Sequence, residues 1–339
     1  MRSSSICYLC LSDNEYEDFL LPAERAALAT LFTSVIRINP EGFSDMDAWH
    51  AWLEQEKPEV LVTCWKTPTL PEDPKHPGLS ELKYLCHLTG TVRKLVPRAL
   101  IESGLIVTNW GSSISRVVAE CGLLLILTEL RRSSLWSLRM HRDNAWKDKD
   151  LDTRSLFNQK VGLHGLGSIS RCLVDLLKPF DVSISAYSPS VPDETFEKLG
   201  VHRADSLEDL FSQNYIIVEL AALTPKNHQI VDERLLKLIP EDGVFVNIGR
   251  GAVVDESALA RLAAAGRIRV ALDVYSKEPL PGDSPFRAIE HVTLLPHISG
   301  PTVDQRCAAG AHGVENLSRY VAQGELSAIV DLWGYDHAT

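Results

Sequence analysis

Three residues in the second half of the chain, Arg250, Glu278 and His297, have the side chains that a proton-coupled reaction on an organic acid requires. Each follows an apolar run that predicts a strand, so we expect all three at the carboxyl edge of one parallel sheet, where open α/β sheets bind ligands. Histidine exchanges protons in the physiological range, and a neighbouring carboxylate orients the imidazole and stabilises its charged form. A guanidinium can hold a substrate carboxylate through two parallel hydrogen bonds. Taken singly, each residue also suits a structural role: a surface charge, a turn residue and a satisfied loop histidine.

A glycine turn at residues 160–170 offers a binding place for a dinucleotide. The segment reads Lys-Val-Gly-Leu-His-Gly-Leu-Gly-Ser-Ile-Ser, and an amphipathic helix and a second apolar strand follow it. Gly165 permits the tight turn, Gly167 lets a pyrophosphate approach the backbone, and the helix that begins near Ser168 points free N–H groups at the phosphate. Ser170 stands where the pattern has a third glycine. For this segment alone, an ordinary strand-to-helix turn is the alternative.

Strand and helix signals alternate on both sides of this turn, which predicts parallel sheets with helices on both faces. Asp255 is expected to cap a helix, and two successive α/β blocks meet near residue 109. Strands are expected at 6–11, 35–38, 59–64, 82–88, 105–108, 215–220, 244–248, 269–274 and 291–295. Helices are expected from Pro22, at 45–54, 94–102, 206–211, 232–238 and 256–265, and from a capping box at Thr302 to about residue 322.

A long helix is expected at about 114–131, and its middle, residues 121–127, is apolar on every side. A surface helix has one apolar stripe, so this helix needs cover all round. We favour an interface between two copies of the chain; burial inside a single chain is the alternative.

The bulk composition limits the classes of function. The chain has 339 residues, enough for about two domains, and its formal net charge of −11 argues against nonspecific nucleic-acid binding. Seven cysteines without framework spacing predict free thiols in a reducing compartment, and Cys7 and Cys10 lie in a strand-like run that does not suit a thioredoxin-type motif. The sequence has no recognisable secretory leader, membrane span or metal-ligand spacing, so we expect a cytoplasmic protein that binds neither membrane nor metal.

The segments around the three candidate catalytic residues resemble the D-isomer-specific 2-hydroxyacid dehydrogenase family. Arg250 lies in Asn-Ile-Gly-Arg-Gly-Ala-Val-Val-Asp-Glu, Glu278 lies shortly after Ala-Leu-Asp-Val and directly before Pro-Leu, and His297 lies in Leu-Pro-His-Ile. Segments 117–120 and 223–225 also match, and order and spacing agree over nearly the whole chain. The resemblance implies that Arg250 binds the substrate carboxylate, Glu278 tunes the histidine and His297 is the acid/base.

The resemblance also implies a fold: a Rossmann-type cofactor domain inserted into a flavodoxin-like substrate domain, both doubly wound α/β with parallel sheets. The substrate domain would comprise residues 1–108 and 306–339, and the dinucleotide-binding domain residues 109–305, with the long helix joining a homodimer. Cofactor contacts are expected from Gly165, Leu166, Gly167, Ser168, Ile169, Ser188, Leu223, Thr224, Ile248, Asp273 and Gly300. Substrate contacts are expected from Thr89, Gly90, Thr91, Arg93 and Arg250.

The end of the second strand of the cofactor domain departs from the family pattern. Members that use NAD commonly have Asp there, whereas this chain has Ser188 and no arginine at 189 or 190. Ser188 neither repels nor attracts a 2′-phosphate, so NAD and NADP both stay open and we expect a modest preference of roughly 5- to 30-fold. If Arg203 folds over the ribose, NADP is favoured.

The loop at residues 87–93 is also unusual. It reads His-Leu-Thr-Gly-Thr-Val-Arg where the family has a glycine-rich loop that ends in Val-Asp, so Arg93 replaces an acid. Its backbone N–H groups would still face a carboxylate. Trp65, Lys66 and Trp110 lie in matching loops, where they either shape the pocket or only pack.

These observations predict an NAD(P)-dependent oxidoreductase that interconverts a small 2-keto acid and a D-2-hydroxy acid. Two alternatives stay open. One is a cofactor-sensing binding protein like the family's corepressors. The other is a relative that has lost cofactor binding, which Ser170 and Ser188 motivate.

Overall fold

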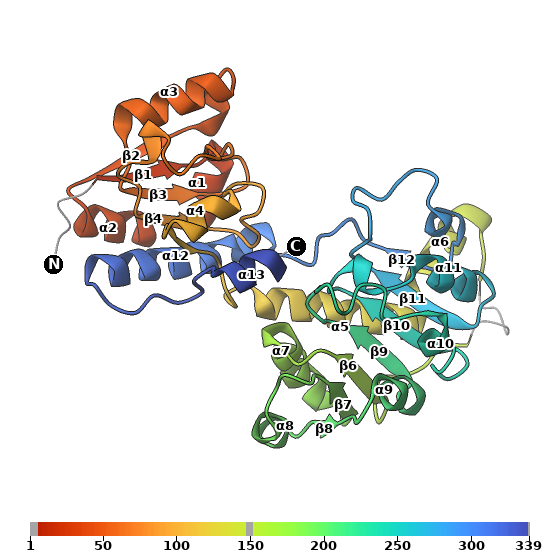
Figure 1. The fold of residues 1–339 in the computed structure, drawn as a ribbon. Helices are drawn as coiled ribbons and strands as arrows, with labels where there is room; N and C mark the ends of the chain where they lie inside the picture. The colour runs from red at the N-terminus through yellow and green to blue at the C-terminus, as the bar shows by residue number, and fades with distance from the viewer. Residues whose placement is uncertain (1–5, 147–151, 338–339) are drawn as a thin grey trace. The chain divides into compact units, whose positions relative to one another are not determined.

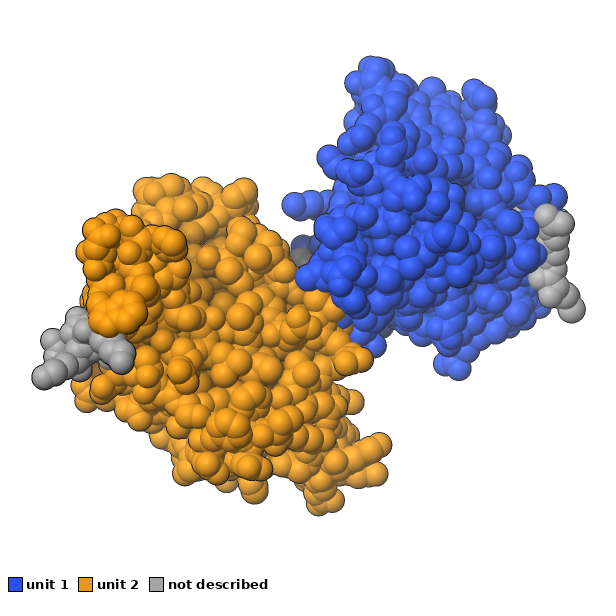
Figure 2. Space-filling view, turned by 180° about the vertical axis from the view of Figure 1, so that it is seen from behind, with its two compact units in different colours: residues 1–114, 301–339 blue, residues 115–300 orange. Residues whose placement is uncertain are grey.

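A computed structural model describes residues 6–146 and 152–337 of the chain. The chain divides into two compact units: unit 1 comprises residues 1–114 and 301–339, and unit 2 comprises residues 115–300 (Figure 2). Each unit is built on one parallel sheet with helices packed against it (Figure 1). The predicted α/β fold with two doubly wound parallel sheets is therefore confirmed.

Unit 1 has a flavodoxin-like sheet. Its strands run in the order β2-β1-β3-β4-β5, and every neighbouring pair is parallel. The helix α12 comes from the C-terminal part of the chain and packs against α1 and α2, which closes this discontinuous unit (Figure 1). The strands are β1 Ile6–Cys10, β2 Ser34–Ile38, β3 Val60–Thr63, β4 Tyr84–His87 and β5 Ile106–Thr108. The α-helices are α1 Asp13–Phe19, α2 Pro22–Leu31, α3 Met46–Glu56, α4 Arg98–Glu102, α12 Arg306–Val321 and α13 Leu332–His337.

Unit 2 has a Rossmann-type sheet of seven parallel strands in the order β12-β11-β10-β9-β6-β7-β8. The chain order reverses between β6 and β9, and ligands of such sheets bind at the carboxyl ends of the strands at this switch point. The strands are β6 Lys160–His164, β7 Ser183–Tyr187, β8 His202–Arg203, β9 Ile216–Glu219, β10 Gly243–Asn247, β11 Ile268–Leu272 and β12 Thr293–Leu294. The α-helices are α5 Ser115–Arg131, α6 Ser133–Asp143, α7 Ser168–Leu177, α8 Asp193–Leu199, α9 Leu207–Gln213, α10 Glu233–Leu236 and α11 Glu256–Ala264.

The central strands of unit 2 explain why this sheet is parallel. Every residue of β9, β10 and β11 is buried, as expected of strands that helices cover on both faces. The helix α11 begins where the sequence predicts, because the Asp255 carboxylate accepts a 3.0 Å hydrogen bond from the Ala258 N–H.

Several helices differ from the predictions. The sequence did not predict the helices α1, α6 and α8. A capping box nevertheless marks the start of α1, where Glu15 Oε2 accepts a 2.9 Å hydrogen bond from the Ser12 N–H. The helix expected at 94–102 begins only at Arg98, because Pro97 precedes it and restricts the residue before itself to an extended conformation. The capping box expected at Thr302 is wrong: a short 3₁₀ turn lies there, without a side-chain cap, and α12 follows from Arg306.

The long helix α5 has one covered and one open side. Val118, Ala119, Leu125 and Ile126 are buried within unit 2, to which α5 belongs, whereas Leu124 is 56% exposed. Unit 2 therefore does not provide the all-round cover that the apolar sequence calls for. Across the described residues, no helix combines the length and the apolar content that a bilayer crossing requires.

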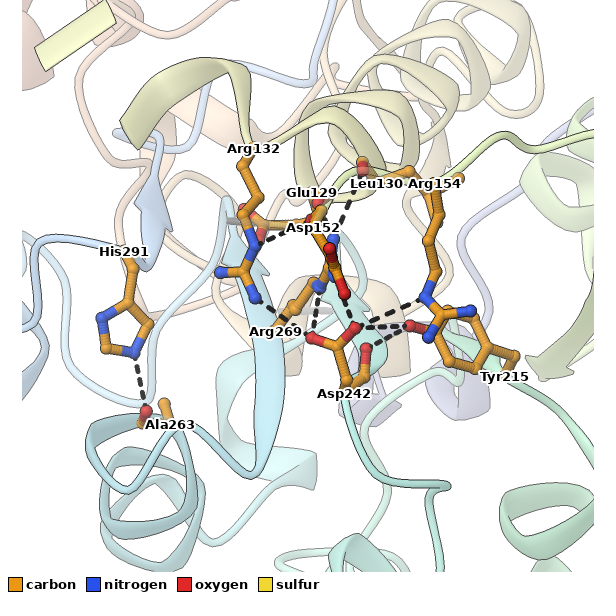
Figure 3. A network of polar contacts seen from close by, with 10 residues as sticks. All are labelled: Glu129, Leu130, Arg132, Asp152, Arg154, Tyr215, Asp242, Ala263, Arg269 and His291. Atoms are coloured by element: carbon orange, nitrogen blue, oxygen red, sulfur yellow. Dashed lines mark hydrogen bonds and ion pairs between the residues drawn. The ribbon is translucent and has the colours of Figure 1, made fainter. Parts of the chain in front are cut away.

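A network of charges joins α5 to the amino ends of β10 and β11 (Figure 3). Arg269, whose side chain is 2% exposed, binds both carboxylate oxygens of Asp242 at 2.7 and 2.5 Å. The same guanidinium donates to the Glu129 carbonyl at 3.0 Å, and Tyr215 and Arg132 also bind Asp242. The network lies at the strand edge opposite to the candidate site, so we assign it to holding the scaffold together.

Candidate active site

His297 and Glu278 form a hydrogen-bonded pair at the carboxyl edge of the unit 2 sheet. Glu278 lies in the loop after β11, and His297 lies in the loop after β12. Their closest atoms, His297 Nδ1 and Glu278 Oε2, are 2.6 Å apart. The other carboxylate oxygen, Oε1, accepts from the Tyr275 N–H at 2.9 Å, which fixes the orientation of the carboxylate. The imidazole is about half exposed, so its second nitrogen is open to a ligand.

Asp273 holds the loop that carries His297. Its fully buried carboxylate accepts from the Ile298 N–H at 2.8 Å and from the Ser299 N–H at 2.9 Å. His297 itself has a left-handed backbone with a φ of 56°, a conformation that costs on the order of 1–3 kcal/mol in a non-glycine residue. The two hydrogen bonds to Asp273 therefore sustain a strained residue. Asp273 was expected to contact the cofactor, but both of its carboxylate oxygens are already engaged.

Arg250 follows β10 in a tight turn that Asn247 organises. The Asn247 side chain accepts from the Gly249 N–H at 3.0 Å and donates to the Arg250 carbonyl at 3.2 Å. The guanidinium donates to the Gly249 carbonyl at 2.7 Å. Burial lowers the pKa of Arg250 from its usual value, and the nearby Glu278 carboxylate counters this effect. A cation that is shielded from water beside the His297 and Glu278 pair suits the binding of a carboxylate.

The glycine turn after β6 has the shape that a dinucleotide needs. Gly165 has a φ of 97°, and a Cβ there would lie 3.1 Å from the Ala221 backbone. A Cβ on Gly167 would meet nothing within 4 Å, so the backbone there faces open space. Gly167 directly precedes α7, and the N–H groups at the start of this helix have no side-chain cap. Ser170 fits in place of glycine because its hydroxyl donates to the Gly165 carbonyl at 2.9 Å.

The other predicted cofactor residues differ in what their side chains can offer. Leu166 and Ile248 are buried, so only their backbones can reach a ligand. Thr224 is tied to Asn227 by its N–H and its hydroxyl, at 2.6 and 3.0 Å. The other predicted cofactor residues are half-buried or exposed, so a ligand can reach them: Ser168, Ile169, Leu223 and Gly300.

A family model for the D-isomer specific 2-hydroxyacid dehydrogenase, NAD binding domain, matches residues 123–299, which is more than half of the chain. The chain belongs to the D-isomer specific 2-hydroxyacid dehydrogenase family. The resemblance that the sequence motifs carry is thereby confirmed, and so is a Rossmann domain for a nicotinamide dinucleotide.

Named relatives support the same enzyme class. The chain is 32% identical to the D-3-phosphoglycerate dehydrogenase of Methanocaldococcus jannaschii over 68% of its own length and 43% of that protein, so it spans less than half of this relative. It is 33% identical to the glyoxylate/hydroxypyruvate reductase A HPR2 of Arabidopsis thaliana, over 65% of this chain and 69% of the relative. D-mandelate dehydrogenase of Rhodotorula graminis shares the fold, with a TM-score of 0.79 at 21% identity over 96% and 97% of the two chains. The expectation of an oxidoreductase of the 2-hydroxyacid dehydrogenase class is confirmed.

In this family member, the predicted substrate residues Thr89, Gly90, Thr91 and Arg93 lie in unit 1, on the loop after β4. Hydrogen bonds hold the loop: the Trp110 N–H donates to the Thr89 carbonyl at 3.1 Å, and the Asn109 side-chain amide donates to the Gly90 carbonyl at 2.8 Å. A Cβ on Gly90 would lie 2.8 Å from the Trp110 ring, so this ring packs directly on the loop. Trp110 thus has a packing role that explains the glycine.

A buried histidine lies under the same loop. His87, at the end of β4, has its Nδ1 2.9 Å from the Thr63 hydroxyl and its Nε2 2.5 Å from the Thr89 hydroxyl. Burial lowers the pKa of His87 to about 3, so the ring is neutral at physiological pH. A neutral ring has one donor and one acceptor nitrogen, and both are used here. The sequence offered no signal for this role beyond a histidine at a strand end.

Trp65 and Lys66 have surroundings of their own in unit 1. Trp65 is 50% exposed, packs edge-on against Phe19, and lies below the Arg306 guanidinium at 5.2 Å. Lys66 forms an exposed ion pair with Glu41 at 3.6 Å.

One further pair of charged residues near the turn was not recognised from the sequence. The Nδ1 atom of His164, the last residue of β6, is 2.5 Å from Oε2 of the fully buried Glu219. Glu219 also accepts from the Ala221 N–H at 2.8 Å. Burial alone would lower the pKa of His164, but the Glu219 carboxylate outweighs it and raises the pKa above its usual value. The pair links the ends of β6 and β9, on either side of the switch point.

Proposed function

We propose that this protein interconverts a 2-keto acid and a D-2-hydroxy acid, with His297 as proton donor in the reduction and acceptor in the oxidation. The observation that carries the proposal is the 2.6 Å contact between His297 Nδ1 and Glu278 Oε2, beside the half-buried Arg250. Because the carboxylate occupies Nδ1, Nε2 is the nitrogen left to face a substrate oxygen.

The chemistry follows from these three side chains. A bound nicotinamide would supply or accept the hydride at the substrate carbon. In the reduction, negative charge develops on the carbonyl oxygen, and His297 neutralises it by giving up its Nε2 proton. Glu278 stabilises the imidazolium before the transfer, and Arg250 holds the substrate carboxylate so that the carbonyl stays aligned.

The residues of the glycine turn would hold the cofactor. The open space at Gly167 and the uncapped N–H groups of α7 suit a pyrophosphate, which needs close backbone approach and a positive field. Ser170 does not obstruct this arrangement, since its hydroxyl hydrogen-bonds within the turn. This removes one of the two reasons for considering a relative that has lost cofactor binding.

The loop after β4 would recognise the substrate from unit 1. Thr89, Gly90 and Thr91 offer backbone N–H groups, and Arg93 is an exposed cation at the end of the loop. Trp110 and His87 would position this loop without contacting the substrate.

A homodimer is the assembly that we propose. Large apolar side chains are exposed on two successive helices: Leu124 of α5 and Leu138 and Met140 of α6 are 56%, 40% and 48% exposed. Such an exposed apolar surface indicates a protein interface. We also propose the cytoplasm as the compartment, since all seven cysteines are free thiols.

A panel of 2-keto acids tests this function. Purified protein with NADH or NADPH is expected to oxidise the reduced cofactor in the presence of at least one acid, which absorbance follows. Cofactor binding without any oxidation across the panel would instead support a cofactor-sensing binding protein.

A further inference from the structure

An arginine from β8 closes the loop that follows β7. Arg203 pairs with Ala186 in the sheet register, so its backbone lies beside the end of β7. Its Nη2 donates to the Val191 carbonyl at 2.7 Å, its Nε donates to Asp193 Oδ1 at 2.7 Å, and its Nη1 lies 3.5 Å from the Ser188 carbonyl. The guanidinium carbon lies 4.4 Å from the centre of the Phe196 ring. The side chain is therefore fixed next to Ser188 although fifteen residues separate the two in sequence.

This position is where a Rossmann domain reads the adenosine ribose. The residue at the end of the second strand, here Ser188, normally accepts hydrogen bonds from the ribose hydroxyls, and an arginine nearby accommodates a 2′-phosphate. Ser188 has no charge with which to repel that phosphate. The guanidinium beside it has five N–H groups, of which the contacts above engage three. The arginine side chain is 33% exposed, so the remaining N–H groups are within reach of a ligand.

Resting on the proposed use of a nicotinamide cofactor, we propose that Arg203 binds the 2′-phosphate of NADP(H) and gives this enzyme a preference for the phosphorylated cofactor. Phosphate and guanidinium form charge-assisted, bidentate hydrogen bonds. Stacking on Phe196 and the bond to the Val191 carbonyl fix the side chain in advance, so little side-chain freedom is lost on binding.

Asp193 is the competitor of the phosphate in this arrangement. Its carboxylate is 79% exposed, and ion pairs of such exposed groups contribute little to stability. A phosphate has a larger charge and more acceptor oxygens, so it takes over the guanidinium when the cofactor binds. Without the cofactor, Asp193 keeps Arg203 neutralised and in place.

Fluorescence titrations of NADPH and NADH against wild type and Arg203→Gln test this assignment. We expect wild type to bind NADPH more tightly, and the variant to lose about 10- to 100-fold in NADPH affinity while NADH affinity stays within about threefold. Asp193→Asn is expected to bind NADPH more tightly than wild type, because it removes the competing carboxylate. Arg234→Gln is the matched control, since this arginine lies elsewhere in unit 2 and pairs with Glu208.

Competition by adenosine 2′,5′-bisphosphate and by AMP separates this inference from the proposed function. We expect Arg203→Gln to weaken the bisphosphate and to leave AMP unchanged. Equal losses for both nucleotides would mean that Arg203 only holds the loop. A wild-type preference for NADH would mean that Asp193 and not Arg203 contacts the ribose. Either result overturns the inference about Arg203 and leaves the proposed dehydrogenase function unaffected. If wild type binds neither cofactor, the proposed function fails as well.

Discussion

At the scale of single residues, the candidate site depends on how His297, the proposed proton donor, is held. Glu278 fixes one nitrogen of the His297 ring at 2.6 Å, and Asp273 fixes the backbone just after it through two N–H groups. The strand β12, which leads into the loop that carries His297, is only two residues long, so the sheet itself gives this loop little support. Small changes to these anchors should therefore move the reacting nitrogen.

Asp273→Asn separates a positioning role from direct cofactor contact. An asparagine keeps one acceptor but places an amide donor against the second N–H, so the loop should shift. We expect kcat to fall about 10- to 100-fold while the dissociation constant of the cofactor changes little, because misplacement of a catalytic group slows the chemical step. A weakened cofactor with an unchanged kcat would show instead that Asp273 contacts the cofactor.

Residue types and spacing were enough to find the histidine, the glutamate and the glycine turn, but not the contacts that hold them. In the sequence, Ser170 only departs from the glycine pattern. The structure shows that its hydroxyl donates a hydrogen bond to the Gly165 carbonyl. Asp273 lies 25 residues before Ile298, so no local pattern connects the two. Similarly, the Arg203 side chain reaches Ser188 only because β7 and β8 are neighbours in the sheet.

At the scale of elements, α5 is attached to the sheet by charges as well as by apolar packing. Glu129 is buried in α5, and the Thr293 hydroxyl of β12 donates to its carboxylate at 2.5 Å. Burial raises the pKa of Glu129 to about 7, despite the opposing influence of Thr293 and of the nearby arginines. The sequence suggested only an apolar helix, since a single glutamate in such a run indicates nothing about its partner.

Glu129 makes stability depend on pH in a direction unusual for a carboxylate. Its folded pKa lies above the ordinary value of 4.5, so between about pH 4.5 and 7 the folded state binds more protons than the unfolded one. This group's contribution to the free energy of unfolding should fall as pH rises through that window and level off above it. This slope in the free energy of unfolding can reach about 1.4 kcal/mol per pH unit. We expect Glu129→Gln to abolish it in urea titrations from pH 5 to 8. An unchanged slope in the variant would contradict the assignment.

Periodicity predicted the long and strongly patterned elements better than the short ones. Apart from β8, which was not predicted, the strands of both sheets lie close to their predicted ranges, and so do the helices α2, α3, α5 and α11. The helix α6 was missed because it continues directly from α5 after Arg132, whose left-handed φ of 49° breaks the helix without a glycine or proline. The helix α8 is seven residues long, too short for a clear apolar stripe.

At the scale of the whole molecule, the open side of α5 predicts association of two chains. Leu124→Glu puts a charge on this side, and it should shift the sedimentation of the protein from dimer to monomer at micromolar concentration. Leu21→Glu is the control, because Leu21 is a 43% exposed leucine that belongs to unit 1, whereas α5 belongs to unit 2. A wild-type protein that sediments as a monomer would contradict the proposed assembly.

The central claim is that His297 transfers the proton in a hydride-transfer reaction, and kcat of His297→Asn tests it most directly. His291→Asn is the matched control. His291 precedes β12, at the end of this strand opposite to His297, and its ring Nε2 lies 2.7 Å from the Ala263 carbonyl (Figure 3). With the best 2-keto acid and saturating reduced cofactor, we predict that His297→Asn loses about 10²- to 10⁴-fold in kcat with a nearly unchanged cofactor dissociation constant, while His291→Asn keeps wild-type turnover. Wild-type turnover by His297→Asn would contradict the account.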